Sequence, residues 1–150
     1  MKVIKGDLLE RAKEGEFDLI LHGCNCFCTM GAGIAKGIKR YFPEAYAEDQ
    51  KTKSGHKTKL GTCSFAVIEK FGLIVVNAYT QFDYRGRGVK VDYDALRSCM
   101  KWIKTNFSGE KIGLPKIGAG LAGGDWGRIS QIIEEELAGE DVTLVEYVGH

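Results

Sequence analysis

Apolar residues recur along the chain with the periods of strands and of helices, so the pattern predicts an alternating α/β protein. Short apolar runs bounded by turn residues predict strands. These fall at Lys2–Lys5, Phe17–His22, Thr62–Glu69, Leu73–Tyr79, Lys111–Pro115 and Val142–Val148. Apolar residues spaced three or four apart predict helices. These fall at Leu8–Lys13, Gly33–Tyr41 and Glu44–Lys53, with one helix capped by Asp92 that runs to Phe107 and one capped by Asp125 that Gly139 ends.

The order of these elements predicts the architecture. Only Lys70, Phe71 and Gly72 separate Thr62–Glu69 from Leu73–Tyr79, which favours an antiparallel hairpin. Helices separate most of the other strands, and this arrangement favours parallel neighbours. We therefore expect a three-layer α/β/α sandwich with a mixed, mostly parallel sheet. A chain of 150 residues without a linker or repeat predicts a single domain over residues 1–150.

The composition excludes several classes of protein. A hydrophobic content of 44% is ordinary for a globular domain, and a net charge of +1 does not favour nucleic-acid binding. The clusters Lys51–Lys53 and Lys57–Lys59 are expected to form a solvated loop. No apolar run is long enough to span a membrane, and the first residues lack a signal-peptide core. We therefore expect a cytoplasmic protein that binds no membrane.

Five cysteines are present, an odd number that does not favour a disulfide framework. Cys24, Cys26 and Cys28 form a CxCxC pattern, whereas structural zinc sites use pairs of the CxxC type. Small buried thiols are the better interpretation, and no metal or cofactor is expected.

The stretch Leu19–Ala35 carries the first candidate site. It begins as a buried strand, passes through a polar loop with Gly31 and Gly33, and continues as a helix. The unpaired amides at a helix start and the positive end of its dipole favour an anion.

A second glycine-rich loop, Gly118–Gly124, also follows a strand and precedes a helix. In an open α/β sheet both loops would emerge at the carboxyl ends of the strands, where ligands bind. Two such loops could hold a diphosphate between them. Neither loop has the GK[ST] ending of a P-loop or the GxGxxG pattern, so nucleoside triphosphate hydrolysis and dinucleotide redox chemistry are disfavoured.

These motifs together resemble the macro domain, an ADP-ribose-binding module. The resemblance covers essentially the whole chain and includes Gly6–Leu8, Asn25 with Gly31–Ala35, and Gly118–Gly123. The segments Leu21–Cys26 and Val142–Tyr147 are similar to the branch that contains ADP-ribose 1''-phosphate phosphatases and the terminal ADP-ribose protein glycohydrolase. Small stand-alone macro domains of this kind also occur in bacteriophages, and a phage-encoded member would lie in the cytoplasm of the host cell.

The resemblance implies a role for each matching position. Asp7 would accept a hydrogen bond from the adenine amino group beside the Leu8 amide, and Tyr147 would lie against the adenine. Asn25 would hold the hydroxyls of the distal ribose. The amides that would line the distal ribose and one phosphate belong to Gly31, Ala32, Gly33 and Ile34. Those that would wrap the diphosphate belong to Gly118, Ala119, Gly120, Leu121 and Ala122.

The catalytic assignments stay open at this point. His22 is either a satisfied histidine at a strand end or a general acid or base beside the distal ribose. Asp125 is foremost a helix cap, and the same carboxylate could position a water molecule. The segment Thr80–Lys90 is expected to be a mobile loop. Its residues Phe82, Tyr84 and Arg85 form either a lid over the distal ribose or a plain surface excursion.

We therefore predict hydrolysis of ADP-ribose 1''-phosphate, with His22, Asn25 and Asp125 as the catalytic candidates, by a monomer. One alternative is a binding module for ADP-ribose or ADP-ribosylated protein, and another is an ADP-ribosyl-ester hydrolase. The resemblance implies a lysine and an aspartate for the glycohydrolase mechanism. Gln81 and Ala122 stand at those places, which argues against a covalent lysine intermediate.

Overall fold

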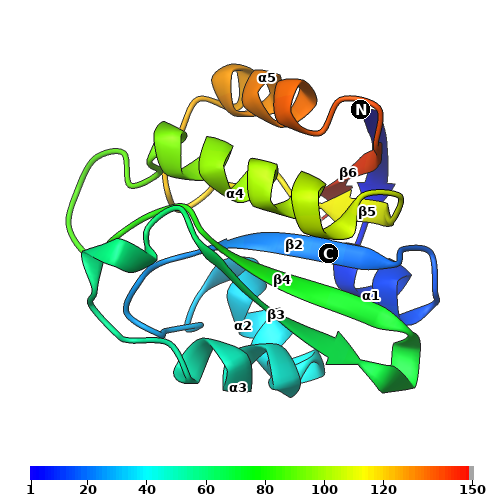
Figure 1. The fold of residues 1–150 in the computed structure, drawn as a ribbon, viewed down its shortest axis with the longest axis horizontal. Helices are drawn as coiled ribbons and strands as arrows, with labels where there is room; N and C mark the ends of the chain where they lie inside the picture. The colour runs from blue at the N-terminus through cyan, green and yellow to red at the C-terminus, as the bar shows by residue number, and fades with distance from the viewer. Residues whose placement is uncertain (149–150) are drawn as a thin grey trace.

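A computed structural model describes residues 1–148 and contains a six-stranded sheet in the order β1-β6-β5-β2-β4-β3 (Figure 1). The strands are β1 (Lys2–Gly6), β2 (Leu19–Cys24), β3 (Cys63–Ile68), β4 (Leu73–Tyr79), β5 (Lys111–Leu114) and β6 (Asp141–Tyr147). Only the β3–β4 pair is antiparallel among the strand pairs of the described chain. The predicted hairpin and the mostly parallel sheet are confirmed.

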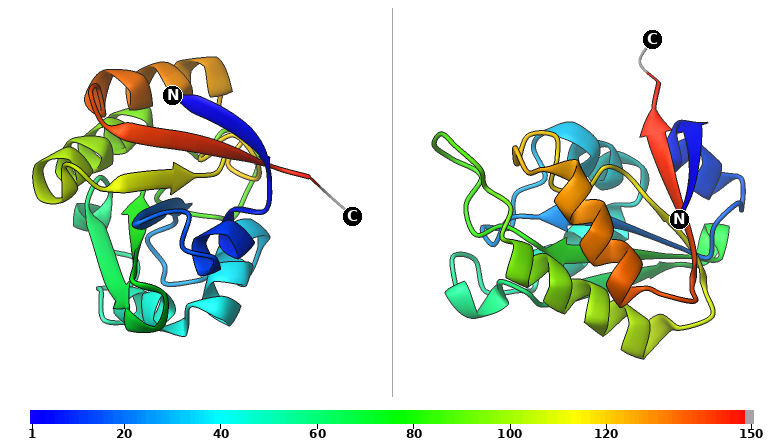
Figure 2. Two further views of the ribbon diagram at one scale, coloured as in Figure 1. Left: turned by 90° about the vertical axis from the view of Figure 1, so that its right-hand side faces the viewer. Right: turned by 90° about the horizontal axis from the view of Figure 1, so that it is seen from above.

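The α-helices cover the sheet on both faces. One layer contains α1 (Leu8–Lys13), α2 (Gly33–Tyr41) and α3 (Pro43–Gln50), and the other contains α4 (Tyr93–Phe107) and α5 (Trp126–Glu136). Figure 1 shows α4 and α5 on one side of the sheet and α2 and α3 on the other, and Figure 2 shows the same layers from two further directions. The chain therefore forms the predicted three-layer sandwich.

The strand β2 shows why consecutive apolar residues mark a central strand. Leu19 and Leu21 join the core under α4 and α5, whereas Ile20 joins the core under α1, α2 and α3. Side chains of a strand alternate between the two faces, and both faces of this strand are covered.

The helix α4 follows its predicted apolar stripe. Its buried members are Leu96, Cys99, Met100 and Ile103. Phe107, the last member of the stripe, is half-buried and packs edge to face against Trp102 and Phe65. Asp92 caps the helix as predicted, because its carboxylate accepts a hydrogen bond of 2.9 Å from the Ala95 amide.

Two expectations are wrong in their detail. The helix α3 ends at Gln50 instead of Lys53, because the Thr52 amide turns back to the Asp49 carbonyl at 3.0 Å. Lys57–Lys59 forms a short 3-10 helix, and Lys59 is buried rather than solvated. The Lys59 ammonium is satisfied inside the protein, since it donates to the Cys26 carbonyl at 3.1 Å.

Within residues 1–148, every helix falls short of the length and apolar character that a membrane span requires.

Candidate functional site

Five neighbouring parallel strands end at the same edge of the sheet, and the candidate site lies there. The segments that leave this edge are Asp7 after β1, residues 25–32 after β2, residues 80–92 after β4 and residues 115–125 after β5, with Tyr147 at the end of β6. The strand order places Asp7 and Tyr147 at one end of the site, called the β1 end below. It places residues 80–92 at the opposite end, called the β4 end.

A cleft of about 690 Å³ occupies the β1 end. Its walls include five residues predicted for the ligand, namely Asp7, Leu8, Gly33, Ile34 and Tyr147. The remaining walls come from Leu9, Gly37, Tyr41, Pro115, Lys116, Val145 and Glu146. Asn25 and the segment Gly118–Ala122 are not among the walls, so the cleft at the β1 end does not include these predicted ligand-binding residues.

Asp7 has a structural role that the sequence analysis missed. Its Oδ1 atom caps α1 by accepting hydrogen bonds from the Leu9 and Glu10 amides at 2.9 and 3.1 Å. Within residues 1–148, Asp7 Oδ2 accepts no hydrogen bond and the Leu8 amide donates none. An acceptor and a donor are therefore exposed side by side at the β1 end, as recognition of a purine edge requires.

The first glycine-rich loop presents unpaired amides. Ala32 precedes α2 and supplies no side-chain cap, and Gly33 has a φ of +58° that a residue with a Cβ rarely adopts. In the described part of the chain, no amide of residues 31–34 donates a hydrogen bond to a protein group. This row of donors at a helix start favours an anion.

The second glycine-rich loop folds back on itself. The Gly124 amide donates to the Gly118 carbonyl at 2.8 Å, and the Ala119 amide donates to the Lys116 carbonyl at 3.2 Å. Four amides of the predicted set remain unpaired across residues 1–148: those of Gly118, Gly120, Leu121 and Ala122. Ala119 is thus the one predicted donor whose amide is already occupied.

The two glycine-rich loops meet. A Cβ atom added to Gly33 would lie 3.5 Å from Cδ1 of Leu121, which is itself 79% exposed. The unpaired amides of both loops therefore border the same space between β2 and β5. Such a pair of opposed donor rows is suited to a diphosphate.

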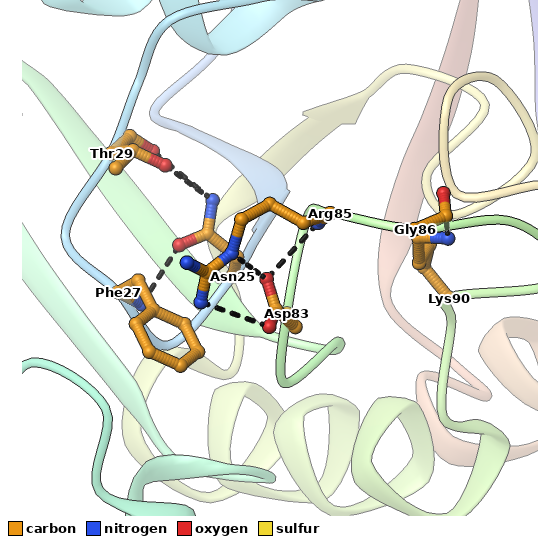
Figure 3. A network of polar contacts seen from close by, with 7 residues as sticks. All are labelled: Asn25, Phe27, Thr29, Asp83, Arg85, Gly86 and Lys90. Atoms are coloured by element: carbon orange, nitrogen blue, oxygen red, sulfur yellow. Dashed lines mark hydrogen bonds and ion pairs between the residues drawn. The ribbon is translucent and has the colours of Figure 1, made fainter.

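Asn25 stabilises its own loop. Its Nδ2 atom donates to the Thr29 hydroxyl at 2.7 Å, and its Oδ1 atom accepts from the Phe27 amide at 2.8 Å (Figure 3). The residue is only 8% exposed, so any contact with a ligand involves a small surface. These internal hydrogen bonds were not predicted from the sequence.

Residues 80–92 connect the two glycine-rich loops. The Phe82 carbonyl accepts a hydrogen bond of 2.8 Å from the Cys26 amide, and the Lys90 amide donates to the Ala122 carbonyl at 2.7 Å. Gln81 and Val91 pair with each other across the base of the segment. The segment expected to be mobile is therefore anchored at both ends, and it extends from the fold just before α4 (Figure 1).

His22 lies inside the protein, with no exposed surface. Its Nε2 atom lies 2.7 Å from Asn77 Oδ1, and Asn77 Nδ2 donates to the Ala45 carbonyl at 3.0 Å. Asn77 Oδ1 is thus the acceptor and His22 Nε2 the donor, as in a neutral imidazole. Burial lowers the pKa of His22 to about 4, although the Asn77 hydrogen bond acts in the opposite direction. This placement favours the satisfied strand-end histidine over the general acid.

Asp125 caps α5 as predicted. Its Oδ1 atom accepts a hydrogen bond of 2.9 Å from the Gly127 amide, and the side chain is exposed. The Asp125 amide itself donates to the Tyr93 hydroxyl at 3.0 Å. These contacts fix the point where the second glycine-rich loop enters the helix.

The cysteines of the first loop are thiols. Cys24 and Cys26 are buried, as predicted, and Cys28 is half-buried. Burial raises the pKa of both buried thiols, to about 11 for Cys26, so they stay protonated near neutral pH. The described residues contain no group of three or more His, Cys, Asp or Glu side chains arranged to hold a metal ion.

A buried polar cluster stabilises the Asn25 loop next to the β4 end. The sequence analysis did not predict this cluster. The Tyr79 hydroxyl donates to Asp49 Oδ1 at 2.7 Å, and Lys59 Nζ lies 4.5 Å from the Tyr79 ring centroid. Lys59 also donates to the Cys26 carbonyl and contacts the Cys28 sulfur at 3.4 Å. The cluster therefore fixes the backbone on which Asn25 and Phe27 are carried.

The fold and the two amide loops define an α/β protein with a candidate anion site at the carboxyl edge of its sheet. The sequence model described as Macro domain matches residues 21–133, so the chain belongs to the macro domain family. An uncharacterized 17.5 kDa protein of Enterobacteria phage T4 is 36% identical, over 98% of this chain and 96% of the phage protein.

Two further relatives carry the names of enzymes. The ADP-ribose glycohydrolase OARD1 of Bos taurus is 28% identical, over 96% of this chain and 88% of the bovine protein. An ADP-ribose 1''-phosphate phosphatase of Aspergillus oryzae is 44% identical over 46 residues, which are 31% of this chain and 21% of the fungal one. A solved structure from Bacteroides thetaiotaomicron, of unknown function, superimposes with a TM-score of 0.83 at 30% identity, covering 97% of this chain and 96% of that one.

Proposed function

We propose that this protein binds ADP-ribose and hydrolyses ADP-ribose 1''-phosphate to ADP-ribose and inorganic phosphate. The observation that carries the proposal is the approach of the Leu121 side chain to Gly33, because it brings together two loops that each carry a row of unpaired amides. The macro domain family and the two relatives named for ADP-ribose chemistry support the choice of ligand.

The geometry supports a simple orientation of the ligand. The adenine would lie at the β1 end, with Asp7 Oδ2 accepting from its amino group and Tyr147 along the wall of the cleft. The diphosphate would lie between the amide rows, where backbone dipoles replace cations. The distal ribose would then lie beside Asn25, toward the β4 end.

Hydrolysis needs water to attack phosphorus while the bond from phosphorus to the ribose O1'' oxygen breaks. The departing O1'' oxygen takes up one proton, either from the attacking water or from the solvent, which then receives the proton of the water. No covalent enzyme intermediate is required. We assign Asn25 and Asp125 to positioning the ribose and the water. We assign His22 a structural role and not a proton-transfer role, since a buried neutral imidazole with a pKa of about 4 is a poor match for proton transfer at neutral pH.

Hydrolysis of ADP-ribosyl esters on proteins is the second candidate, because the relative named ADP-ribose glycohydrolase aligns over 96% of this chain. Gln81 and Ala122 stand where the resemblance implies a lysine and an aspartate. Gln81 is half-buried with its backbone paired to Val91, and Ala122 is buried. These positions disfavour a covalent lysine route.

The proposal is tested in two stages with the purified wild-type protein. Titration calorimetry with ADP-ribose is expected to give saturable binding at one site per chain. The absence of both binding heat and a thermal shift would contradict the proposal. Incubation with ADP-ribose 1''-phosphate is expected to release phosphate, whereas a glutamate-ADP-ribosylated protein keeps its label. Binding without phosphate release would leave the non-catalytic binding module as the function, and loss of the protein label would favour the ester hydrolase.

A further inference from the structure

The β4 end of the site carries an arginine held in a fixed orientation. The Arg85 guanidinium carbon lies 4.9 Å from the centroid of the Phe27 ring (Figure 3). Phe27 in turn packs edge to face against Phe82, with the ring centroids 5.1 Å apart. Lys57 Nζ lies 5.1 Å from the Phe82 centroid. Two cations from separate segments therefore flank a pair of aromatic rings beside the Asn25 loop.

Asp83 orients the guanidinium from one edge only. Arg85 Nε donates to Asp83 Oδ1 at 3.0 Å and Nη2 donates to Oδ2 at 3.1 Å, while the Arg85 amide also donates to Oδ1. This bidentate pair uses the Nε–Nη2 edge of the fork. Within residues 1–148, Nη1 donates no hydrogen bond, so the Nη1–Nη2 edge remains open for two oxygens of an anion.

The strand order gives this open edge a place relative to the ligand. From one end of the site to the other, the strands run β1, β6, β5, β2 and β4. Asp7 follows β1, the second glycine-rich loop follows β5, Asn25 follows β2 and Arg85 follows β4. A ligand laid along this edge, with its adenine at the β1 end and its distal ribose at Asn25, directs the next group toward Arg85.

Phe27 links Asn25 to Arg85. Phe27 donates its amide to Asn25 Oδ1 and receives the Arg85 guanidinium on its ring. Figure 3 shows Asn25, Phe27 and Arg85 grouped together, with Asp83 at the end of the guanidinium. A shift of the loop would therefore move the proposed ribose contact and the arginine together.

The charge distribution favours an anion at this position. The chain carries a net charge of only +1, and the amide rows need no cation to bind a diphosphate. Lys57 and Arg85 nevertheless place two cations at the β4 end, on the rings of Phe82 and Phe27. The Asp83 charge is already paired with Arg85, so it opposes an incoming anion only weakly.

We infer that Arg85 is the specificity residue for a phosphate monoester on C1'' of the distal ribose, which it binds through its Nη1–Nη2 edge. The inference rests on the proposed ligand orientation and deepens it, because it explains how phosphorylated ADP-ribose is distinguished from ADP-ribose itself. Arginine suits this role better than lysine, since its planar fork matches two phosphate oxygens at once.

The test compares ADP-ribose and ADP-ribose 1''-phosphate as competitors for a fluorescent ADP-ribose probe, read within seconds of mixing. The wild-type protein is expected to bind the phosphorylated compound about tenfold more tightly, as a charged bidentate hydrogen bond provides. Arg85→Gln is expected to lose this preference while its affinity for ADP-ribose stays within about twofold. Arg85→Lys is expected to retain part of the preference for ADP-ribose 1''-phosphate. Lysine keeps the positive charge but lacks the planar fork that binds two oxygens.

Arg87→Gln is the matched control, since Arg87 lies two residues away in the same exposed segment and donates no hydrogen bond within residues 1–148. It is expected to keep the wild-type preference. In steady state, Arg85→Gln should raise KM for ADP-ribose 1''-phosphate about tenfold and change kcat by less than about threefold.

The outcomes separate the inference from the proposed function. If the wild-type protein binds both compounds equally, or if Arg85→Gln keeps the preference, the role of Arg85 is contradicted whether or not phosphate is released. A preference that is lost in Arg85→Gln, in a protein that releases no phosphate, supports the role and contradicts only the proposed hydrolysis. A protein that binds neither compound contradicts both.

Discussion

The two ends of the site are held in place by different kinds of structure. At the β1 end, Asp7 begins α1 and Tyr147 ends β6, so helix and sheet hydrogen bonds fix the walls of the cleft. At the β4 end, Asn25 and Arg85 lie on loops whose backbone is fixed by side chains and by a few loop-to-loop hydrogen bonds. Substitutions should therefore affect only local contacts at the β1 end but the shape of the whole site at the β4 end.

The buried polar cluster explains how loops can be ordered enough to bind a ligand. Lys59, Asp49 and Tyr79 are buried beneath the Asn25 loop and contact its carbonyl groups or one another. Buried polar groups need complete hydrogen bonding, so they allow few alternative loop positions. Regular elements at the β1 end need no comparable support.

The largest expected effect comes from breaking the amide clamp between the two ends. Gly33→Val should reduce ADP-ribose affinity more than about 100-fold, because a β-branched residue cannot hold the φ of +58° and its side chain faces Leu121. The strained backbone should also cost about 2 kcal/mol of folding stability. Titration calorimetry and urea denaturation measure the two effects separately.

Gly72→Val is the matched control for this substitution. Gly72 has a φ of +57°, lies in the turn between β3 and β4, and has no atom within 4 Å of an added Cβ. The two variants should lose similar stability, and only Gly33→Val should lose binding. Equal affinities of both variants for ADP-ribose would mean that the Gly33 amides take no part in the site.

The next effect is a pH dependence of stability that originates at His22, beneath the β4 end. Its pKa is about 4 in the folded protein and 6.5 in the unfolded chain. As pH falls from 6.5 to about 4, His22 becomes protonated in the unfolded chain but stays neutral in the folded protein, so the free energy of unfolding decreases. The full loss is about 3 kcal/mol, and above pH 6.5 the contribution of His22 is complete and constant.

Urea denaturation between pH 4 and pH 8 measures this dependence. His22→Gln keeps a donor for Asn77 Oδ1 and removes the titration, so its curve should be flatter than that of the wild type. The difference between the two curves isolates His22 from carboxylates that titrate in the same range. Parallel curves would show that His22 keeps its ordinary pKa and is accessible to protons.

Substitution of Lys59 in the buried polar cluster should lower folding stability more than substitution of the exposed Lys57 in the same turn. Lys59→Met should lower folding stability by about 2 kcal/mol, because a hydrogen bond from a buried ammonium to the Cys26 carbonyl is lost. Lys57→Met, two residues away and exposed, should change stability by about 0.5 kcal/mol at most. The reverse order would contradict the structural importance of the cluster for the β4 end.

The regular elements and the glycine-rich loops were predictable because their signals are local. The apolar stripe of α4 and the caps Asp92 and Asp125 depend on residues within a few positions of one another. The amide rows follow from glycine placement between a strand and a helix. In these regions the local sequence and the fold agree, so the expected elements form with small changes at their ends.

The support of the β4 end was not predictable, because its partners are distant in sequence. Lys59 contacts a carbonyl 33 residues away, and His22 bonds to Asn77 across 55 residues. A lysine in the sequence Lys-Thr-Lys has the composition of a solvated turn, and only the folded chain shows that it is buried. Periodicity carries no information on such pairings.

The smallest effect is expected at the β1 end, where Tyr147 forms part of the cleft wall and is 68% exposed. Tyr147→Ala should weaken ADP-ribose binding about fivefold, near the lower limit for stacking of a base on an aromatic ring. Tyr147→Phe should stay within about twofold, because the ring rather than the hydroxyl faces the adenine in the proposed orientation.

Titration calorimetry with ADP-ribose and with ADP distinguishes stacking from a general disturbance of the cleft. Both ligands carry the adenine, so a stacking contact predicts the same fold-loss for each in Tyr147→Ala. A loss confined to ADP-ribose would place the effect at the distal ribose, which the strand order puts toward the opposite end of the site. Since Tyr147 lies at the end of β6 and beside Gly6 of β1, its truncation leaves the amide rows in place, and phosphate release should continue at an unchanged kcat.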